Sequence, residues 1–153
     1  MHPKAIMSNM KGVRHASMDD DNVSTWTVDI SASDCPDGLR KALLASREHT
    51  LRLRIVFSDD FPICPPFLYV STPQFAPMTG HVLHGGAICS ELLSTGDSPS
   101  AWRPTIRMNA LIETVLHTMA DGKPVVVRSS PGTESVARES FKRAAARYGW
   151  QMN

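Results

Sequence analysis

The sequence has 153 residues, a net charge of +1, and 42% hydrophobic residues. This length fits one domain with a buried core, and the balanced charge provides no electrostatic basis for binding nucleic acid. No apolar run approaches the roughly 18–20 residues needed to cross a bilayer, so we expect neither a nucleic-acid partner nor a membrane partner.

The cysteine content indicates a reducing compartment. Cys35, Cys64 and Cys89 are widely spaced and odd in number, so they cannot all pair within one chain. Reduced thiols are typical of the cytoplasm and nucleus, and the first residues contain no apolar signal core that would favour secretion. None of the cysteines belongs to a CxxC pair, so we expect no metal site.

The beginning of the chain predicts a short helix followed by a strand. Residues 1–12 are expected to form the helix, which ends at Gly12. Residues 23–30 carry β-branched and aromatic residues with partial alternation, which favours a strand. Turn residues follow, and 39–46 is expected to be a short helical or irregular segment.

The remaining elements are two more strands and then two helices. In residues 49–57, leucine, isoleucine and phenylalanine alternate with arginine, as in a half-buried strand. A third strand is expected at 67–71, and turns of these lengths favour an antiparallel meander. Apolar residues recur at helical spacing over 105–120 and again over 133–148. Strands followed by helices predict an α+β domain.

Cys89 stands in the most informative segment of the sequence. It follows Gly85-Gly86-Ala87-Ile88, and a glycine pair permits positive φ or a close approach of the backbone. His81 and His84 lie eight and five residues before it. A nucleophilic thiol on such a loop is suited to hold a thioester. The alternative is a buried cysteine that only packs, and we interpret Cys35 and Cys64 in that way.

Four segments of the chain, taken in order, resemble the ubiquitin-conjugating (E2) catalytic domain. They are the approach to a tryptophan-bearing first strand, a proline-rich loop, the cysteine loop, and a Trp-x-Pro motif before a long helix, at 20–26, 57–66, 85–93 and 102–104. The Gly-Gly-Ala-Ile-Cys string places the resemblance nearest to the Q-type branch. The resemblance covers roughly residues 13 to 150.

This resemblance implies the UBC-like fold, a four-stranded antiparallel meander flanked by helices. Residues 1–153 would form a single UBC domain, in which 1–12 is a short or abbreviated N-terminal helix. Cys89 would accept the C-terminal glycine of ubiquitin from an activating enzyme (E1) as a thioester. Transfer would follow to a substrate lysine or to a ligase (E3). No metal or organic cofactor is implied, since ATP is used by the E1.

The resemblance also implies contact residues for protein partners. Pro62 and Ile63 match one loop through which the family meets the E1 and E3 enzymes, and Arg103 with Pro104 matches the other. An exposed isoleucine is an ordinary interface anchor. Plain loop packing is the alternative for all four residues, because proline stiffens a loop whatever it binds.

One departure from the family concerns the oxyanion. Most members carry His-Pro-Asn before the cysteine. In this sequence His81 stands at the position of that asparagine. The Q-type branch likewise lacks the tripeptide. We predict that a ring N–H of His81 stabilises the oxyanion, together with backbone amides of Gly85-Gly86. The alternative for His81 is a loop histidine bonded to backbone. A Cys-His nucleophile pair is disfavoured, because a strong base beside a thioester promotes hydrolysis.

The sequence therefore predicts an E2 ubiquitin-conjugating enzyme, an acyltransferase that works through the thioester of Cys89. Its partners would be ubiquitin, an E1, an E3 and a protein substrate. A non-catalytic E2 variant that binds ubiquitin or a ligase is the alternative, and the missing asparagine favours it. A cysteine hydrolase is more distant, since no triad can be assembled from spacing.

Overall fold

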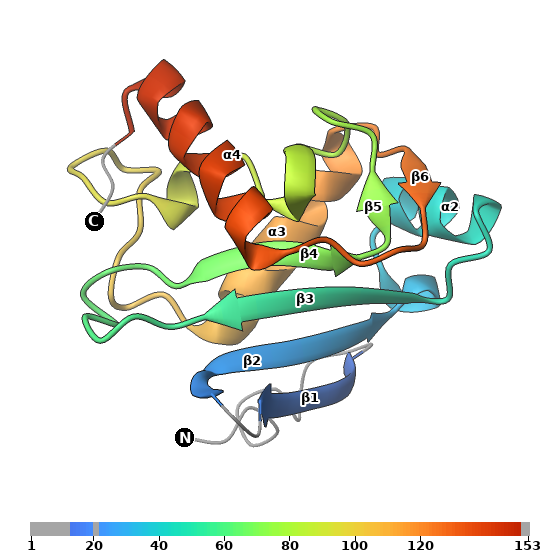
Figure 1. Cartoon of the computed structure of the whole chain (residues 1–153), viewed down its shortest axis with the longest axis horizontal. Coiled ribbons are helices and arrows are strands. Elements are labelled where there is room, and N and C mark those ends of the chain that lie inside the picture. The colour runs from blue at the N-terminus through green and yellow to red at the C-terminus, as the bar shows by residue number, and fades with distance from the viewer. Residues whose placement is uncertain (1–12, 20–21, 151–153) are drawn as a thin grey trace.

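A four-stranded antiparallel sheet forms the centre of the computed structural model, which describes residues 13–19 and 22–150. The helix predicted for 1–12 lies outside the described residues. The strands follow one another in sheet order (Figure 1): β1 (Val13–Asp19), β2 (Asn22–Ser31), β3 (Thr50–Val56) and β4 (Phe67–Thr72). The predicted antiparallel meander and α+β class are confirmed.

The three predicted strands correspond to β2, β3 and β4. Leu51, Leu53 and Ile55 on β3 are buried, as their alternation with arginine predicts. On the opposite side of β3, Arg52 forms an ion pair with Asp29 of β2, with 2.7 Å between Nε and Oδ1. The alternation therefore places the core on one face of the sheet.

The resemblance implies four strands, but the residue patterns did not locate the first strand, β1. Its backbone pairs antiparallel with β2 alone, so it is an edge strand of the sheet. The segment Val13-Arg14-His15-Ala16-Ser17-Met18-Asp19 is poor in β-branched and aromatic residues. An edge strand can form from such a sequence because pairing with a neighbour supplies its backbone hydrogen bonds.

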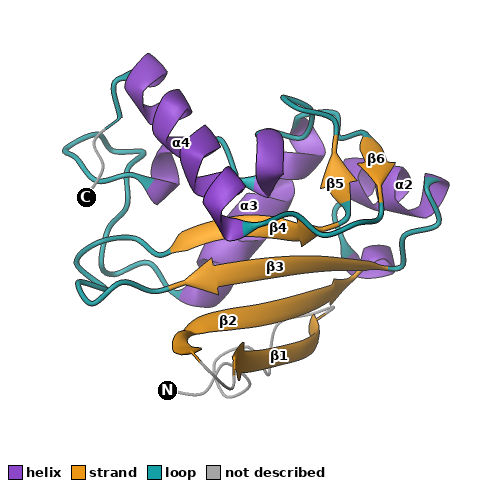
Figure 2. Ribbon diagram, in the orientation of Figure 1, coloured by secondary structure: helices purple, strands orange, loops and turns teal. Residues whose placement is uncertain are grey.

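The described residues form three α-helices, which pack around the sheet: α2 (Asp37–Ala45), α3 (Met108–Asp121) and α4 (Glu134–Tyr148). Helix α3 lies across one face of the sheet (Figure 2), and its inward side chains, Leu111, Ile112, Val115, Leu116 and Met119, are buried. Gly149 has φ +72° and ends α4, as its position predicts. Within the described part of the chain, no helix has the length and apolarity to cross a membrane.

Several small elements were also missed by the sequence patterns. A second, two-stranded sheet pairs β5 (Gln74–Phe75) with β6 (Val126–Arg128). The part of the chain that the structure describes also contains three single-turn helices: η1 (Ala32–Asp34), η2 (His84–Gly86) and η3 (Glu91–Leu93). Elements of two or three residues are too short to produce a periodic pattern, so tertiary pairing determines them.

Residues 81–89 form a tight hairpin that we call the cysteine hairpin. The Leu83 N–H donates to the Ala87 carbonyl at 2.8 Å, and Val82 pairs with Ile88. The turn η2 forms the tip, and Ala87 pairs with Tyr69 of β4. The hairpin is therefore joined to the edge of the main sheet by backbone pairing.

The glycine pair permits this close packing. Gly86 has φ +100°, and a Cβ at this position would overlap the Val70 carbonyl oxygen of β4. Gly85 has φ +85°, and its Cβ would lie 2.7 Å from the Ala137 nitrogen at the start of α4. Only glycine fits between β4 and α4 at these two positions.

Replacing Gly86 by alanine should therefore destabilise the protein by about 3 kcal/mol, because the new methyl group meets rigid backbone. Gly149→Ala is the matched control, since Gly149 also has positive φ but has no other atom within 4 Å of its added Cβ. That change should cost only about 1 kcal/mol. Urea unfolding of both variants provides the measurement, and equal losses would contradict the packing described for Gly86.

Candidate functional site

Cys89 lies at the open end of the cysteine hairpin, where the chain leaves it toward η3. Its backbone N–H donates to the His81 carbonyl at 2.7 Å, which closes the hairpin. The side chain is half-buried and packs against the hydrophobic core. This burial raises the pKa of the Cys89 thiol above its ordinary value. Burial therefore favours the neutral thiol over the thiolate, whose fraction increases as the pH rises.

The other two cysteines have different surroundings. Cys35 is buried, and its thiol donates to the Ser31 carbonyl at 3.5 Å. Burial, with a smaller contribution from the charge of Asp34, raises the pKa of Cys35 to about 11. Cys64 is half-buried in the proline-rich loop, and its N–H donates to the Asp60 carbonyl. Cys35 thus packs in the core, as the sequence predicts, and is a poor nucleophile.

His81 is exposed and adopts φ +56°, which is uncommon for a residue other than glycine. Its ring lies over Gly122 at the end of α3, where an added Cβ would come within 2.7 Å of His81 Cδ2. The Gly80 N–H donates to the Gly122 carbonyl at 2.8 Å and holds the same turn. The hydrogen bond between His81 and Cys89 joins backbone atoms. Within the described residues, the His81 ring forms no hydrogen bond.

The prediction that backbone amides of Gly85-Gly86 help to stabilise the oxyanion at Cys89 does not fit the structure. The pair lies at the tip of the hairpin, whereas Cys89 lies at its open end. Gly86 and Cys89 are three positions apart, and an extended chain spans about 10 Å over that interval. The Gly86 N–H is also occupied, since it donates to the Leu83 carbonyl at 3.0 Å. The glycine pair was correctly recognised as a site of close approach, but the group approached is the backbone of β4.

The two predicted partner loops lie side by side. Nε1 of the buried Trp102 donates to the Pro62 carbonyl at 2.9 Å and so joins one loop to the other. Ile63 is 75% exposed, and Arg103 and Pro104 are exposed as well. The structure therefore brings all four predicted residues together on the same part of the surface.

A series of contacts between aromatic rings connects these two loops to the sheet. Ring centroids are 4.8 Å apart between Trp26 and Phe57, 4.7 Å between Phe57 and Phe61, and 6.2 Å between Phe61 and Trp102. Edge-to-face and tilted contacts at these distances are favourable. Both loops are consequently supported by packing that begins on β2.

Arg103 has a contact that sequence reasoning missed. Its guanidinium donates to the carbonyl oxygens of Gly96 and Ser98, at 3.3 and 2.9 Å, and to that of Trp102. These bonds hold the loop between the cysteine hairpin and Trp102. Arg103 therefore positions the loop, whatever partner it meets, and nothing in the residue pattern indicates these bonds.

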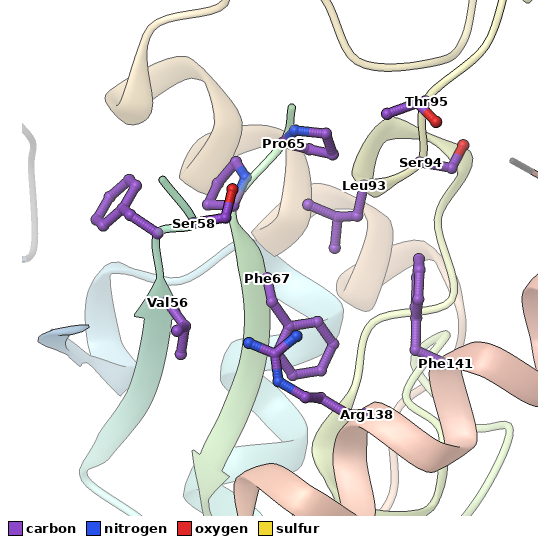
Figure 3. A pocket seen from close by; sticks show the side chains of 11 residues that line it. Val56, Ser58, Pro65, Phe67, Leu93, Ser94, Thr95, Arg138 and Phe141 are labelled. Atoms are coloured by element: carbon purple, nitrogen blue, oxygen red, sulfur yellow. The ribbon is translucent and has the colours of Figure 1, made fainter. Parts of the chain in front are cut away.

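A hollow of about 180 Å³ lies beside the segment that follows Cys89 (Figure 3). Leu93 of η3, Phe67 of β4 and Phe141 of α4 line it, together with Ser94 and Thr95. Leu93 is buried, and its turn begins with Ser90, whose Oγ accepts from the Leu92 N–H at 3.2 Å. The chain after Cys89 is thus anchored by one leucine beside an incompletely filled space.

Arg138 of α4 also lines this hollow. Its guanidinium lies 4.5 Å from the centroid of the Phe67 ring and forms an ion pair with Glu134 at 2.8 Å. Cys89 is not among the residues that line the hollow. Among the described residues, no group of three His, Cys, Asp or Glu side chains is placed to hold a metal ion.

Comparisons with known proteins agree with this geometry. No protein-family model matches the chain. It is 27% identical over 143 residues to the human Q-like protein 1 of the ubiquitin-conjugating enzymes, covering 86% of this chain and 83% of that protein. It is 28% identical over 137 residues to a Q-like ubiquitin-conjugating protein of Drosophila melanogaster, covering 85% of this chain but only 43% of the relative.

The solved structure of human ubiquitin-conjugating enzyme E2 G1 superposes with a TM-score of 0.55 at 21% identity, covering 76% of this chain and 87% of that one. The chain therefore has the UBC fold of the ubiquitin-conjugating enzymes. The curated sequence relatives that it resembles include Q-like proteins of that class, which is the branch that the Gly-Gly-Ala-Ile-Cys string predicts.

Proposed function

We propose that this protein is an active ubiquitin-conjugating enzyme in which Cys89 carries ubiquitin as a thioester. The observation that supports this most strongly is a free, half-buried thiol at the open end of a rigid hairpin. A thiol in that position is held in place by the Cys89 N–H bond and still meets solvent. The relatives named as Q-like ubiquitin-conjugating proteins support the choice of ubiquitin as the modifier.

The proposed loading step is a thiol–thioester exchange that moves the ubiquitin glycine from the E1 cysteine to Cys89. The Cys89 thiol loses its proton, and the thiolate attacks the carbonyl carbon of the ubiquitin C-terminal glycine bound to the E1. The bond to the E1 sulfur breaks, and the released thiolate takes up a proton. A neutral substrate lysine amine then attacks the same carbon, so an amide bond forms and the bond to the Cys89 sulfur breaks. The nitrogen loses a proton, and the released Cys89 thiolate takes up a proton. An E3 cysteine would instead be loaded by a second thiol–thioester exchange.

The raised pKa of Cys89 suits a carrier. A thiolate of higher pKa is a stronger nucleophile once it forms, but it is a poorer leaving group. The thioester is therefore retained until a partner presents an amine in the correct geometry. Because the thiolate is the reactive form, loading should become faster as the pH rises above neutral. ATP is consumed by the E1, so the proposed chemistry needs no cofactor in this chain.

The partner surface of this proposal is formed by the two joined loops. Ile63, at the tip of the proline-rich loop, offers an exposed apolar anchor for an E1 or an E3. Pro62, Arg103 and Pro104 surround it. The proposed compartment is the cytoplasm or the nucleus, where the three free thiols stay reduced.

The charging reaction tests the proposal. Incubation with E1, ubiquitin and ATP should produce an adduct that is stable on a gel without reductant and disappears with reductant. Cys89→Ala should abolish it because no other thiol occupies the hairpin. Cys64→Ala is the matched control and should charge normally. If saturating E1 yields no adduct with the unaltered protein, the non-catalytic binding module replaces this proposal.

His81 is the residue we propose for oxyanion stabilisation, through an N–H of its exposed ring. His81→Ala should slow discharge of the thioester to free lysine about tenfold or more, since the removed donor acts on the tetrahedral intermediate. His84→Ala alters an exposed histidine at the tip of the same hairpin and should discharge normally. Single-turnover discharge after removal of the E1 measures both rates. An unaltered rate in a folded His81→Ala protein would refute the role.

A further inference from the structure

A groove surrounds the tip of the cysteine hairpin, at the end opposite Cys89. One hollow, of about 350 Å³, lies between the segment after β5 and helix α4 and is lined by Met78, His84, Arg143, Arg147 and Tyr148. A second, of about 180 Å³, is lined by Val127 and Arg128 of β6. Pro77 and His84 line both hollows, so the two adjoin. We call this surface the tip groove.

The tip groove is basic without compensating acid. It contains Arg128, Arg143 and Arg147, and no Asp or Glu lines either hollow. Among the described residues, none of these three arginines forms an ion pair, although Arg138 and Lys142 of α4 do. The whole chain has a net charge of only +1, so the positive charge of this surface exceeds that of the chain as a whole.

Helical spacing places two of these arginines on one face of α4. Ser140, Arg143, Ala144 and Arg147 recur at the intervals that place side chains on a single face of a helix. Arg143 donates to the Ser140 Oγ at 3.4 Å, and the Arg147 guanidinium lies 6.0 Å from the centroid of the Tyr148 ring. The guanidinium groups retain donors that face solvent beside the hollow.

Apolar side chains in the tip groove are unusually open to solvent. Met78 is 60% exposed, Val127 is 52% exposed and Tyr148 is 50% exposed. Methionine, tyrosine and arginine are the residue types enriched where proteins bind one another. Two concave hollows separated by His84 also suit side chains of a protein segment better than the flat surface of a bilayer.

We propose that the tip groove binds an acidic, amphipathic segment of a protein partner. Its carboxylates would pair with the guanidinium groups, which match carboxylate geometry in a bidentate manner. Its apolar side chains would enter the hollows beside Met78 and Tyr148. Because the groove lies at the hairpin tip, a bound partner would leave Cys89 and the two joined loops uncovered. This binding does not depend on thioester chemistry.

The probe for this proposal is a short fluorescein-labelled peptide in which Glu alternates with Phe and Leu. A second peptide carries Lys in place of each Glu. Fluorescence anisotropy should show the acidic peptide binding about tenfold or more tightly than its basic counterpart, with an affinity that falls as salt is added. Backbone amide shifts in NMR spectra should change around Met78, His84 and Arg143.

Charge reversal provides the matched pair of variants. Arg143→Glu should weaken binding of the acidic peptide about tenfold. Lys142→Glu makes the same change in charge one residue away, at a lysine paired with Glu139 outside the groove, and should leave binding unaltered. Both variants should charge with ubiquitin as the parent protein does. A failure of peptide binding can therefore be distinguished from a failure of the charging reaction.

Three outcomes would overturn the proposal. The first is equal binding of the acidic and basic peptides, or no binding of either. The second is an Arg143→Glu protein that binds the acidic peptide as the parent does. The third is tighter, Arg143-dependent binding of phosphatidylserine vesicles or of a single-stranded oligonucleotide, which would assign the groove to a lipid surface or to nucleic acid.

Discussion

The contact between the cysteine hairpin and β4 is the interaction on which the rest of the site depends. Ala87 pairs with Tyr69, and Gly86 packs against the carbonyl group of Val70 so closely that no side chain fits. The same turn meets the first residues of α4 through Gly85. A surface loop of nine residues is thereby fixed between a strand and a helix. The thiol at its end gains a defined position without being buried completely.

The hairpin also separates two surfaces. At its open end are Cys89 and the chain that leads to Trp102, whose indole joins the two exposed loops through the Pro62 carbonyl. At its tip lie His84 and the arginines of the tip groove. Under the proposed function, ubiquitin, an activating enzyme and a further partner would each need a separate surface. The arrangement of this hairpin provides two such surfaces from one short segment.

Much of the fold could be predicted because its elements bury residues at regular intervals. The alternation over β3 and the helical spacing over α3 follow directly from one buried face each. Strand β1 could not be found in this way, since its sequence lacks such alternation and its evident constraint is backbone pairing with β2. The pairing of β5 with β6 joins residues about fifty positions apart, which no local pattern reveals.

The site was predictable in part for the same reason. Cys89 and the glycine pair could be identified from their order, but the group that the glycines approach depends on which strand lies beside them. The bonds of Arg103 and the unpaired arginines of the tip groove arise from tertiary neighbours. The position of the His81 ring over Gly122 likewise joins two segments some forty residues apart.

The central claim is that Cys89 is a reachable thiol whose burial raises its pKa, unlike the enclosed Cys35. Alkylation of the native protein by iodoacetamide, followed for each cysteine by mass spectrometry across a range of pH, tests this most directly. The structure predicts that Cys89 reacts, with a midpoint above that of a free cysteine, while Cys35 stays unmodified until the protein unfolds. A Cys89 as inert as Cys35 would contradict the account, as would a midpoint at or below that of free cysteine.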